Sequence, residues 1–345
     1  YLDFSMGWGS VLVGHAREEV ATAVSRRTKL GANFSFVTEE SLLLAEELVR
    51  ACAAVERVRF CASGTEATMY CQRLARAFTA RPKILKFEGA YHGANELGVT
   101  SLFPGRTTDY PRPDPTSAGI ESMVRDTVLV APFNDLKTTA QIVRAEADEL
   151  AGIIVEPFCR CLPPAPGFLE GLRNLCDESG ALLLFDEVVT GFRFAYGGAQ
   201  EYYGVVPDLA AYGKALGGGY PIGAFGGRAD VMEMVRERRL GREPYVWTAS
   251  TLGGNPVTAA AARATLGILR QEGVYARLFE LGRYFREGLE KVLRDAAVAG
   301  QVIGDGPLAQ VVFSDEPVTD YRSLLAADKA RARRTMLGLS DRRVL

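Results

Sequence analysis

The chain has 345 residues, of which 48% are hydrophobic and 24% are charged, and its formal net charge is −2. A chain of this size can bury a large core, and its length favours one large domain with a smaller one beside it. The balanced charge argues against an extended surface for nucleic acid or an anionic membrane, and no apolar run approaches the roughly 18 residues of a membrane span.

The number and spacing of the cysteines and histidines bear on disulfide formation and on metal binding. Six cysteines without a CxxC pair, together with only two histidines, predict free thiols and no metal site. The first residues lack the basic and apolar regions of a secretory signal, so a cytoplasmic location is expected.

Apolar segments of strand character recur along the first part of the chain, and helical patterns separate them. Strands are predicted near residues 58–61, 83–87, 128–130, 152–155, 182–185, 209–212 and 222–226. Helices are predicted at 39–50 and 66–78, because each segment places its apolar residues on one helical stripe. This alternation predicts an α/β fold with a mainly parallel seven-stranded sheet that helices cover on both faces.

After residue 255 the pattern changes. An Ala-rich helix at 257–271, an amphipathic helix at 276–295 and a short β segment at 308–313 predict a smaller α+β domain. We therefore divide the chain into an N-terminal segment 1–30 that joins the small domain, a large domain 31–255, and a small domain 256–345 that is expected to be incomplete. The loop 103–122, rich in Pro, Gly, Thr and Asp, is predicted to be a mobile surface segment or lid.

The first motif with chemical content is Ser63-Gly64-Thr65, which follows a predicted strand and opens a helix. The unpaired N–H groups and the positive dipole end of a helix N-terminus suit a phosphate dianion. An ordinary helix cap, with Glu66 as the capping-box partner, is the alternative interpretation.

Tyr91 and His92 form the second motif, immediately past the predicted strand 83–87. Ligands bind at the C-terminal edge of parallel sheets, so the ring of Tyr91 could stack on a flat heteroaromatic cofactor. Covering of the core by this tyrosine is the alternative. We expect His92 to pack against a cofactor rather than to act as a catalytic base.

Two charged residues stand at the ends of apolar strands. Asp186 follows the strand 182–185, and a buried carboxylate there needs a partner such as a pyridinium nitrogen, unless it only caps the next turn. Lys214 follows the strand 209–212 and precedes three glycines, so it is either a partly desolvated nucleophile or a solvated surface lysine. The spacing around Lys214 does not match a P-loop, which argues against a nucleotide hydrolase.

In this order, the motifs resemble the class III, fold type I family of aminotransferases that depend on pyridoxal 5′-phosphate (PLP), and in particular its glutamate-1-semialdehyde 2,1-aminomutase-like branch. The segments 185–209 and 213–228 carry most of the likeness, which extends to about residue 293. The resemblance implies PLP as the cofactor and a fold type I architecture. It assigns cofactor binding to Ser63, Gly64, Thr65, Tyr91, His92, Glu156, Asp186, Val188, Lys214 and Thr251.

The resemblance also implies the individual roles. Lys214 holds PLP as a Schiff base and shuttles a proton, and Asp186 pairs with the pyridine nitrogen. Val188 packs on the ring face opposite the tyrosine, and Glu156 supports the ring or its phenolic side. Thr251 reaches the phosphate of the neighbouring subunit, which implies a homodimer with the active site at the subunit interface.

The sequence departs from the aminomutase pattern in two segments where a substrate would lie, 103–122 and 158–164. We therefore predict an aminotransferase that uses a small-molecule amino donor and an oxo acceptor. An aminomutase, a PLP racemase or epimerase, and a non-catalytic PLP-binding protein are the alternatives. Arg160 and Trp8 are the predicted substrate contacts; the guanidinium of Arg160 suits a carboxylate, although it could also face solvent.

Overall fold

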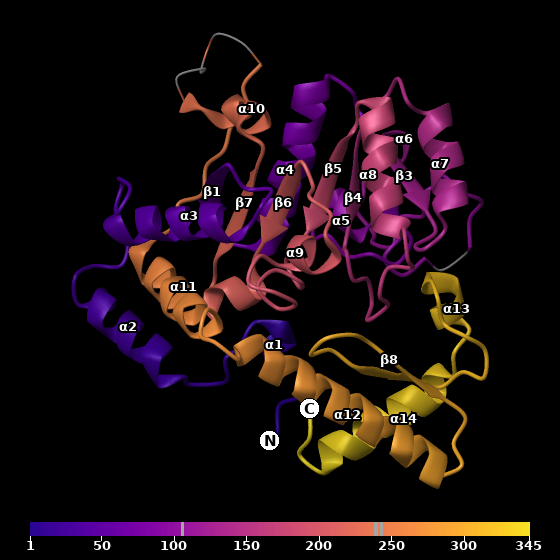
Figure 1. Cartoon of the computed structure of the whole chain (residues 1–345). Helices are drawn as coiled ribbons and strands as arrows, with labels where there is room; N and C mark the ends of the chain where they lie inside the picture. The colour runs from indigo at the N-terminus through magenta and orange to yellow at the C-terminus, as the bar shows by residue number, and fades with distance from the viewer. Residues whose placement is uncertain (105–106, 238–240, 242–243) are drawn as a thin grey trace.

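A seven-stranded sheet forms the centre of the computed structural model, which describes residues 1–104, 107–237, 241 and 244–345 (Figure 1). The strand order is β1-β7-β6-β5-β4-β2-β3. The strands are β1 (Arg57–Cys61), β2 (Lys83–Phe87), β3 (Val128–Ala131), β4 (Leu150–Val155), β5 (Leu182–Asp186), β6 (Leu209–Tyr212) and β7 (Gly223–Gly227). Each lies at the position that the sequence predicts, within two residues at either end, and the mainly parallel α/β sheet is confirmed.

Only β7 runs against the other strands of this sheet, and it pairs antiparallel with both β1 and β6. Ten residues connect β6 to β7, including the short helix η1 (Lys214–Gly217). A parallel crossover needs a dozen residues or more, so a return of this length favours an antiparallel neighbour.

Helices cover both faces of the sheet because side chains alternate along each strand. Leu183 and Phe185 of β5 belong to the core on one face, and Leu182 and Leu184 belong to the core on the other. The first face is covered by α3 (Glu39–Ala51), α7 (Leu136–Ala145), α8 (Phe168–Ser179) and α11 (Pro256–Leu269). The second face is covered by α4 (Gly64–Thr79) and α10 (Ala229–Met232).

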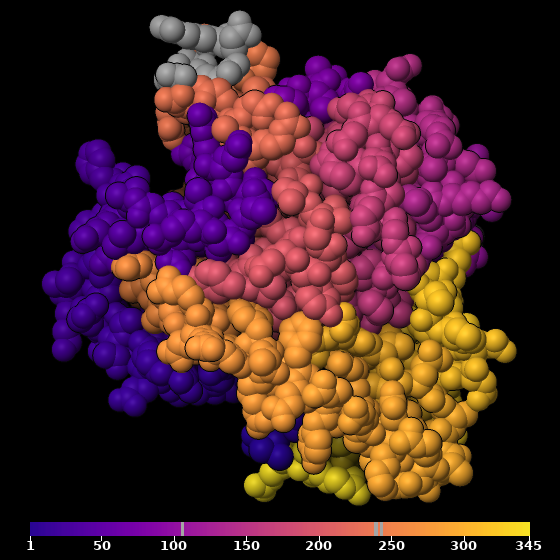
Figure 2. Space-filling model, in the orientation of Figure 1, coloured from indigo at the N-terminus to yellow at the C-terminus, as the bar shows by residue number. Residues whose placement is uncertain are grey.

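The C-terminal part lies below the sheet in Figure 1 and closes the lower end of the molecule in Figure 2. It contains α12 (Val274–Asp295), the antiparallel pair β8 (Gln301–Ile303) and β9 (Gln310–Val312), α13 (Tyr321–Leu325) and α14 (Lys329–Asp341). The sequence predicts α12 and the segment of β9, but not the three-residue β8. The division at residues 30 and 255 stays a prediction; α11 packs against both α2 (Glu18–Thr28) and α3.

Shorter helical segments complete the described fold. They are α1 (Met6–Gly9), α5 (Glu96–Val99), α6 (Val124–Thr127), α9 (Ala199–Tyr203) and η2 (Glu233–Val235). Within the described ranges, no helix combines the length and the apolar character needed to cross a membrane.

The predicted lid 103–122 is tied to the C-terminal part through one buried carboxylate, although residues 105–106 of this loop lie outside the described residues. Glu88 accepts hydrogen bonds from Tyr110 Oη at 2.6 Å and from Arg322 Nε at 2.8 Å. The Arg322 guanidinium also lies 4.2 Å from the centre of the Tyr110 ring. Glu88 therefore joins the loop to α13, and a lid movement of the loop stays a prediction.

A second buried carboxylate, Asp208, connects β5 to the chain beyond β7. The side chain is 6% exposed, and Oδ2 accepts hydrogen bonds from the Leu183 amide and from Arg173 Nη1, both at 2.8 Å. Its Oδ1 accepts a hydrogen bond from Arg228 Nη1, also at 2.8 Å. Removal of this carboxylate would leave a buried amide without an acceptor.

We expect Asp208→Ala to lower the free energy of unfolding by about 2–3 kcal/mol, because one buried amide and two guanidinium groups lose their partner. Urea denaturation measures this change. Asp230→Ala is the matched control: it also removes a partner of Arg228, but Asp230 is 53% exposed, so the loss should stay within about 1 kcal/mol. Equal losses in the two variants would contradict the assigned role.

Candidate active site

A cavity of about 200 Å³ opens at the C-terminal edge of the parallel strands, between the first turn of α4 and the ends of β4, β5 and β6. Open α/β sheets bind their ligands at this edge. The lining residues are Ser63, Gly64, Thr65, Thr68, Tyr91, Gly93, Glu156, Asp186, Val188, Val189 and Lys214. The structure thus brings eight of the residues predicted from the sequence to one cavity.

The N-terminus of α4 forms one wall. Ser63 is the N-cap, and its Oγ accepts a hydrogen bond from the Glu66 amide at 3.2 Å, so the helix cap considered as the alternative is present. The first amides of a helix have no acceptor within the helix, and they favour an anion. A Cβ on Gly64 would lie 2.8 Å from Val188 Cγ1, so this wall requires glycine. The cap and a phosphate site are therefore compatible.

Asp186 is the last residue of β5, and its side chain is 4% exposed. Oδ1 accepts a hydrogen bond from the Val188 amide at 3.1 Å, and Oδ2 lies 2.8 Å from His92 Nδ1. His92 is fully buried, and its Nε2 has no partner among the described residues. A carboxylate that faces a cavity from such a buried position suits a protonated ring nitrogen.

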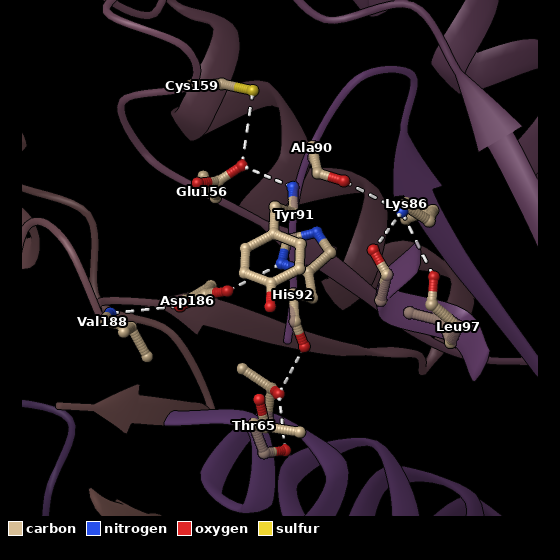
Figure 3. Close-up of polar contacts among 12 residues, drawn as sticks. Thr65, Lys86, Ala90, Tyr91, His92, Leu97, Glu156, Cys159, Asp186 and Val188 are labelled. Atoms are coloured by element: carbon tan, nitrogen blue, oxygen red, sulfur yellow. Dashed lines mark hydrogen bonds and ion pairs between the residues drawn. The ribbon is translucent and has the colours of Figure 1, made fainter. Parts of the chain in front are cut away.

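Glu156, directly after β4, brings a second carboxyl group to the cavity. Its Oε2 accepts a hydrogen bond from the Tyr91 amide at 3.0 Å. Burial raises the pKa of Glu156, and the nearby His92 opposes this change. Figure 3 shows Tyr91, His92, Glu156 and Asp186 gathered in one cluster. The half-exposed Tyr91 therefore lines the same cavity as Glu156 and Asp186.

Lys214 reaches the cavity from the first position of η1. Its φ is 42°, in the left-handed region that non-glycine residues seldom adopt and that is found preferentially at functional sites. The side chain packs beneath α1, because a Cβ on Gly9 would lie 4.0 Å from Lys214 Cδ. Lys214 therefore lines the same cavity as Asp186 and the N-terminus of α4. These groups fit a cofactor that carries an aldehyde, a pyridine nitrogen and a phosphate.

Four residues proposed from the sequence do not line this cavity: His92, which contacts Asp186 from behind, and three others. Trp8 lies in α1 and is 88% exposed. Arg160 donates hydrogen bonds to the Gly89 carbonyl at 2.6 Å and to the Leu102 carbonyl at 3.1 Å, and its guanidinium stacks over Phe103. Thr251 lines a separate, larger groove of about 420 Å³. Contact of Arg160 and Trp8 with a substrate stays a prediction.

Sequence analysis missed several residues around the cavity. Thr68 and Gly93 line it, and Thr68 Oγ1 donates a hydrogen bond to the His92 carbonyl at 2.6 Å. A Cβ on Gly93 would lie 2.6 Å from Thr65 Cα, so the position of this glycine directly after Tyr91-His92 was an available signal. Lys86 was missed as well, although a lysine within an apolar strand is unusual.

Comparisons with known proteins agree with this geometry. Residues 1–333 match the family described as Aminotransferase class-III. The chain is 42% identical to glutamate-1-semialdehyde 2,1-aminomutase from Pelotomaculum thermopropionicum over 335 residues, which cover 96% of this chain and 75% of the relative.

Two solved structures show the same fold. An omega-transaminase from Sphaerobacter thermophilus superimposes with a TM-score of 0.90 at 38% identity, over 96% of this chain and 76% of that one. A transaminase with PLP bound gives a TM-score of 0.84 at 31% identity, over 92% of this chain and 73% of that one. Family match, fold and cavity agree: the chain belongs to the class-III aminotransferase family and its cofactor is PLP.

Proposed function

We propose that this chain transfers an amino group from an amine or amino acid to an oxo acid, with PLP held at Lys214. One observation carries the proposal: a lysine amine, a strand-end carboxylate and a helix N-terminus face a single cavity of about 200 Å³. The residues that would hold the cofactor are Ser63, Gly64, Thr65, Tyr91, Glu156, Asp186 and Val188, with His92 behind Asp186.

Each group of residues has a defined task in this proposal. When bound, PLP supplies a conjugated ring that accepts the electron pair left by a bond broken at the substrate carbon. Asp186 keeps a proton on the ring nitrogen, and His92 fixes the orientation of that carboxylate through its 2.8 Å contact. The first amides of α4 would bind the phosphate, and Tyr91 and Val188, which both line the cavity, would pack against the ring.

Lys214 has two tasks. Its Nζ would hold the cofactor and, when free, would accept a proton from the substrate and return it. General base catalysis of this kind contributes roughly 10²–10⁴-fold to a rate. The confined cavity keeps the amine close to the carbon that it deprotonates.

An intramolecular aminomutase is the second candidate, and the 42% identity to an aminomutase favours it. It would use the same residues but would need no external oxo acid. A racemase or epimerase, and a PLP-binding protein without activity, remain weaker alternatives. A protein that only binds PLP would not need Lys214, Asp186 and Tyr91 together at one cavity.

A homodimer is part of the proposal, and exposed apolar residues support it. Phe36 and Val37 are 88% and 81% exposed, and with Leu42 they line the groove of about 420 Å³ that contains Thr251. Apolar surface gathered in this way marks interaction sites. In the proposed dimer, Thr251 contacts the phosphate of the partner subunit. The cytoplasmic location stays a prediction from the sequence.

We expect Lys214→Ala to keep the fold, seen by circular dichroism and thermal unfolding, and to lower turnover by about 10² or more because the amine is lost. In the native chain, borohydride should trap PLP on the peptide that contains Lys214. Lys291→Ala, which removes an exposed lysine of α12, should retain full activity. Near-normal turnover of Lys214→Ala on every amine tested would refute its role.

The need for an acceptor separates the two candidate reactions. With a panel of amine donors, the transaminase should convert its bound cofactor to the pyridoxamine form, and sustained product formation should require an added oxo acid. Absorbance of the bound cofactor and product analysis measure both. Sustained conversion of glutamate-1-semialdehyde alone, without any oxo acid, would instead establish the aminomutase.

Hybrid dimers test the placement of Thr251. Lys214→Ala and Thr251→Asp each damage the site, the second by bringing a negative charge to the phosphate. If Thr251 serves the partner subunit, mixing the two variants creates dimers with one intact site and restores activity. If it serves its own subunit, the mixture should be no more active than the two variants measured separately. Size-exclusion chromatography with light scattering provides the oligomeric state.

A further inference from the structure

Lys86 is a fully buried lysine that the proposed mechanism does not use. Its Nζ donates hydrogen bonds to the backbone carbonyls of Ala90 at 3.0 Å, Leu97 at 3.2 Å, Gly98 at 3.2 Å and Thr100 at 2.5 Å. We call these four oxygens the carbonyl cage, and Figure 3 shows part of this cage around Lys86. An ammonium group has three donors and no acceptor, so a cage made only of acceptors matches the charged form of lysine.

The position of Lys86 on β2 explains how the carbonyl cage forms. Lys86 points to the same face of the sheet as Ile84, toward the side covered by α4, because side chains alternate along a strand. After β2 the chain turns back over the end of this strand. All four carbonyls belong to this return, the segment 90–100, and two of them come from α5.

The same segment forms one wall of the active site. Tyr91 and His92 lie between the first and second carbonyls of the cage. The segment is also tightly folded on itself, since a Cβ on Gly98 would lie 2.2 Å from the Gly93 carbonyl oxygen. Several carbonyls therefore converge at one point, and only a cation or a set of donors can satisfy them there.

A buried charge at this point is costly, so its presence needs a reason. Burial lowers the pKa of Lys86 to about 7, and the carboxylates of Glu156 and Asp186 oppose this change. An apolar residue would avoid the cost of desolvation but would remove the donor shared by all four carbonyls, of which only those of Leu97 and Gly98 also accept a hydrogen bond from a backbone amide of the described chain. The desolvation of Lys86 therefore opposes folding at β2, and its hydrogen bonds to the carbonyl cage fix the path of the segment 90–100.

We propose that Lys86 is a positioning residue: its ammonium group fixes the segment 90–100 and thereby holds Tyr91 and His92 in place at the PLP site. Lys86 does not line the cavity, so it acts through the backbone that it binds. The inference rests on the proposed function in one respect, namely that Tyr91 and His92 belong to a PLP site. The ordering of the segment does not depend on the reaction.

Lys86→Met tests the proposal, because methionine has a similar length but neither charge nor donors. Lys83→Met is the matched control on the same strand; it removes a lysine that binds Glu146 at 2.7 Å and is partly exposed. In the cofactor-free protein, hydrogen exchange of the peptide 88–101 should accelerate about tenfold or more in Lys86→Met and stay unchanged in Lys83→Met. The dissociation constant of PLP should rise by a similar factor, with a much smaller change in kcat at saturating PLP.

A cation can also replace the missing ammonium group. Lys86→Ala leaves space beside the carbonyl cage, and rings of backbone carbonyls bind K⁺ in place of its hydration shell. At equal ionic strength, KCl should slow exchange of the peptide 88–101 in Lys86→Ala relative to LiCl, and should tighten PLP binding. The native chain should not distinguish the two salts. This response separates a role of the charge from lost packing.

Three results would overturn the proposal: unchanged exchange of the peptide in Lys86→Met, equal acceleration in Lys83→Met, or equal exchange of Lys86→Ala in the two salts. If Lys86→Met does not fold, Lys86→Ala in LiCl, which also lacks the charge and the donors, takes its place in the same comparison with Lys83→Met. Failure here leaves the role of Lys214 untouched, because that role is tested by turnover and borohydride trapping.

Discussion

The site depends on a carboxylate held at the end of a buried strand. Asp186 ends β5 among apolar neighbours, where a negative charge persists only with fixed partners. His92 and the Val188 amide supply two of them from different loops. This requirement draws the segment after β2 and the turn after β5 toward the same point. The cavity then lies between these loops and the N-terminus of α4.

The sequence located the strands and most of the cavity for one physical reason. Fully apolar runs mark strands that are buried on both faces, and the residue after such a run stands at the edge where ligands bind. Asp186, Lys214 and Tyr91 are all found in this way. Features formed by backbone atoms cannot be predicted from apolar runs. The carbonyl cage around Lys86 has no side-chain signature, and the direction of β7 follows from the length of its connection.

Family membership is shown by the whole chain, whereas the reaction type is a prediction that rests on two segments. Relatives named aminomutases and solved structures of transaminases both match nearly the whole chain. The sequence predicts a departure from the aminomutase pattern in the segments 103–122 and 158–164. Arg160, in the second of them, occupies its donors with the Gly89 and Leu102 carbonyls. In this conformation it supports the wall that carries Tyr91, and its contact with a substrate stays a prediction.

The shared carboxylate of Glu88 has a consequence for comparing enzymes of this family. Tyr110 from the loop 103–122 and Arg322 from α13 both bind Glu88. In the sequence, Glu88 lies three positions before Tyr91 and four before His92. A chimera that replaces the loop removes Tyr110 but keeps Arg322, so Glu88 retains the guanidinium and loses the hydroxyl donor. Replacement of both the loop and α13 would remove both donors and leave a buried acid unpaired beside the cofactor wall.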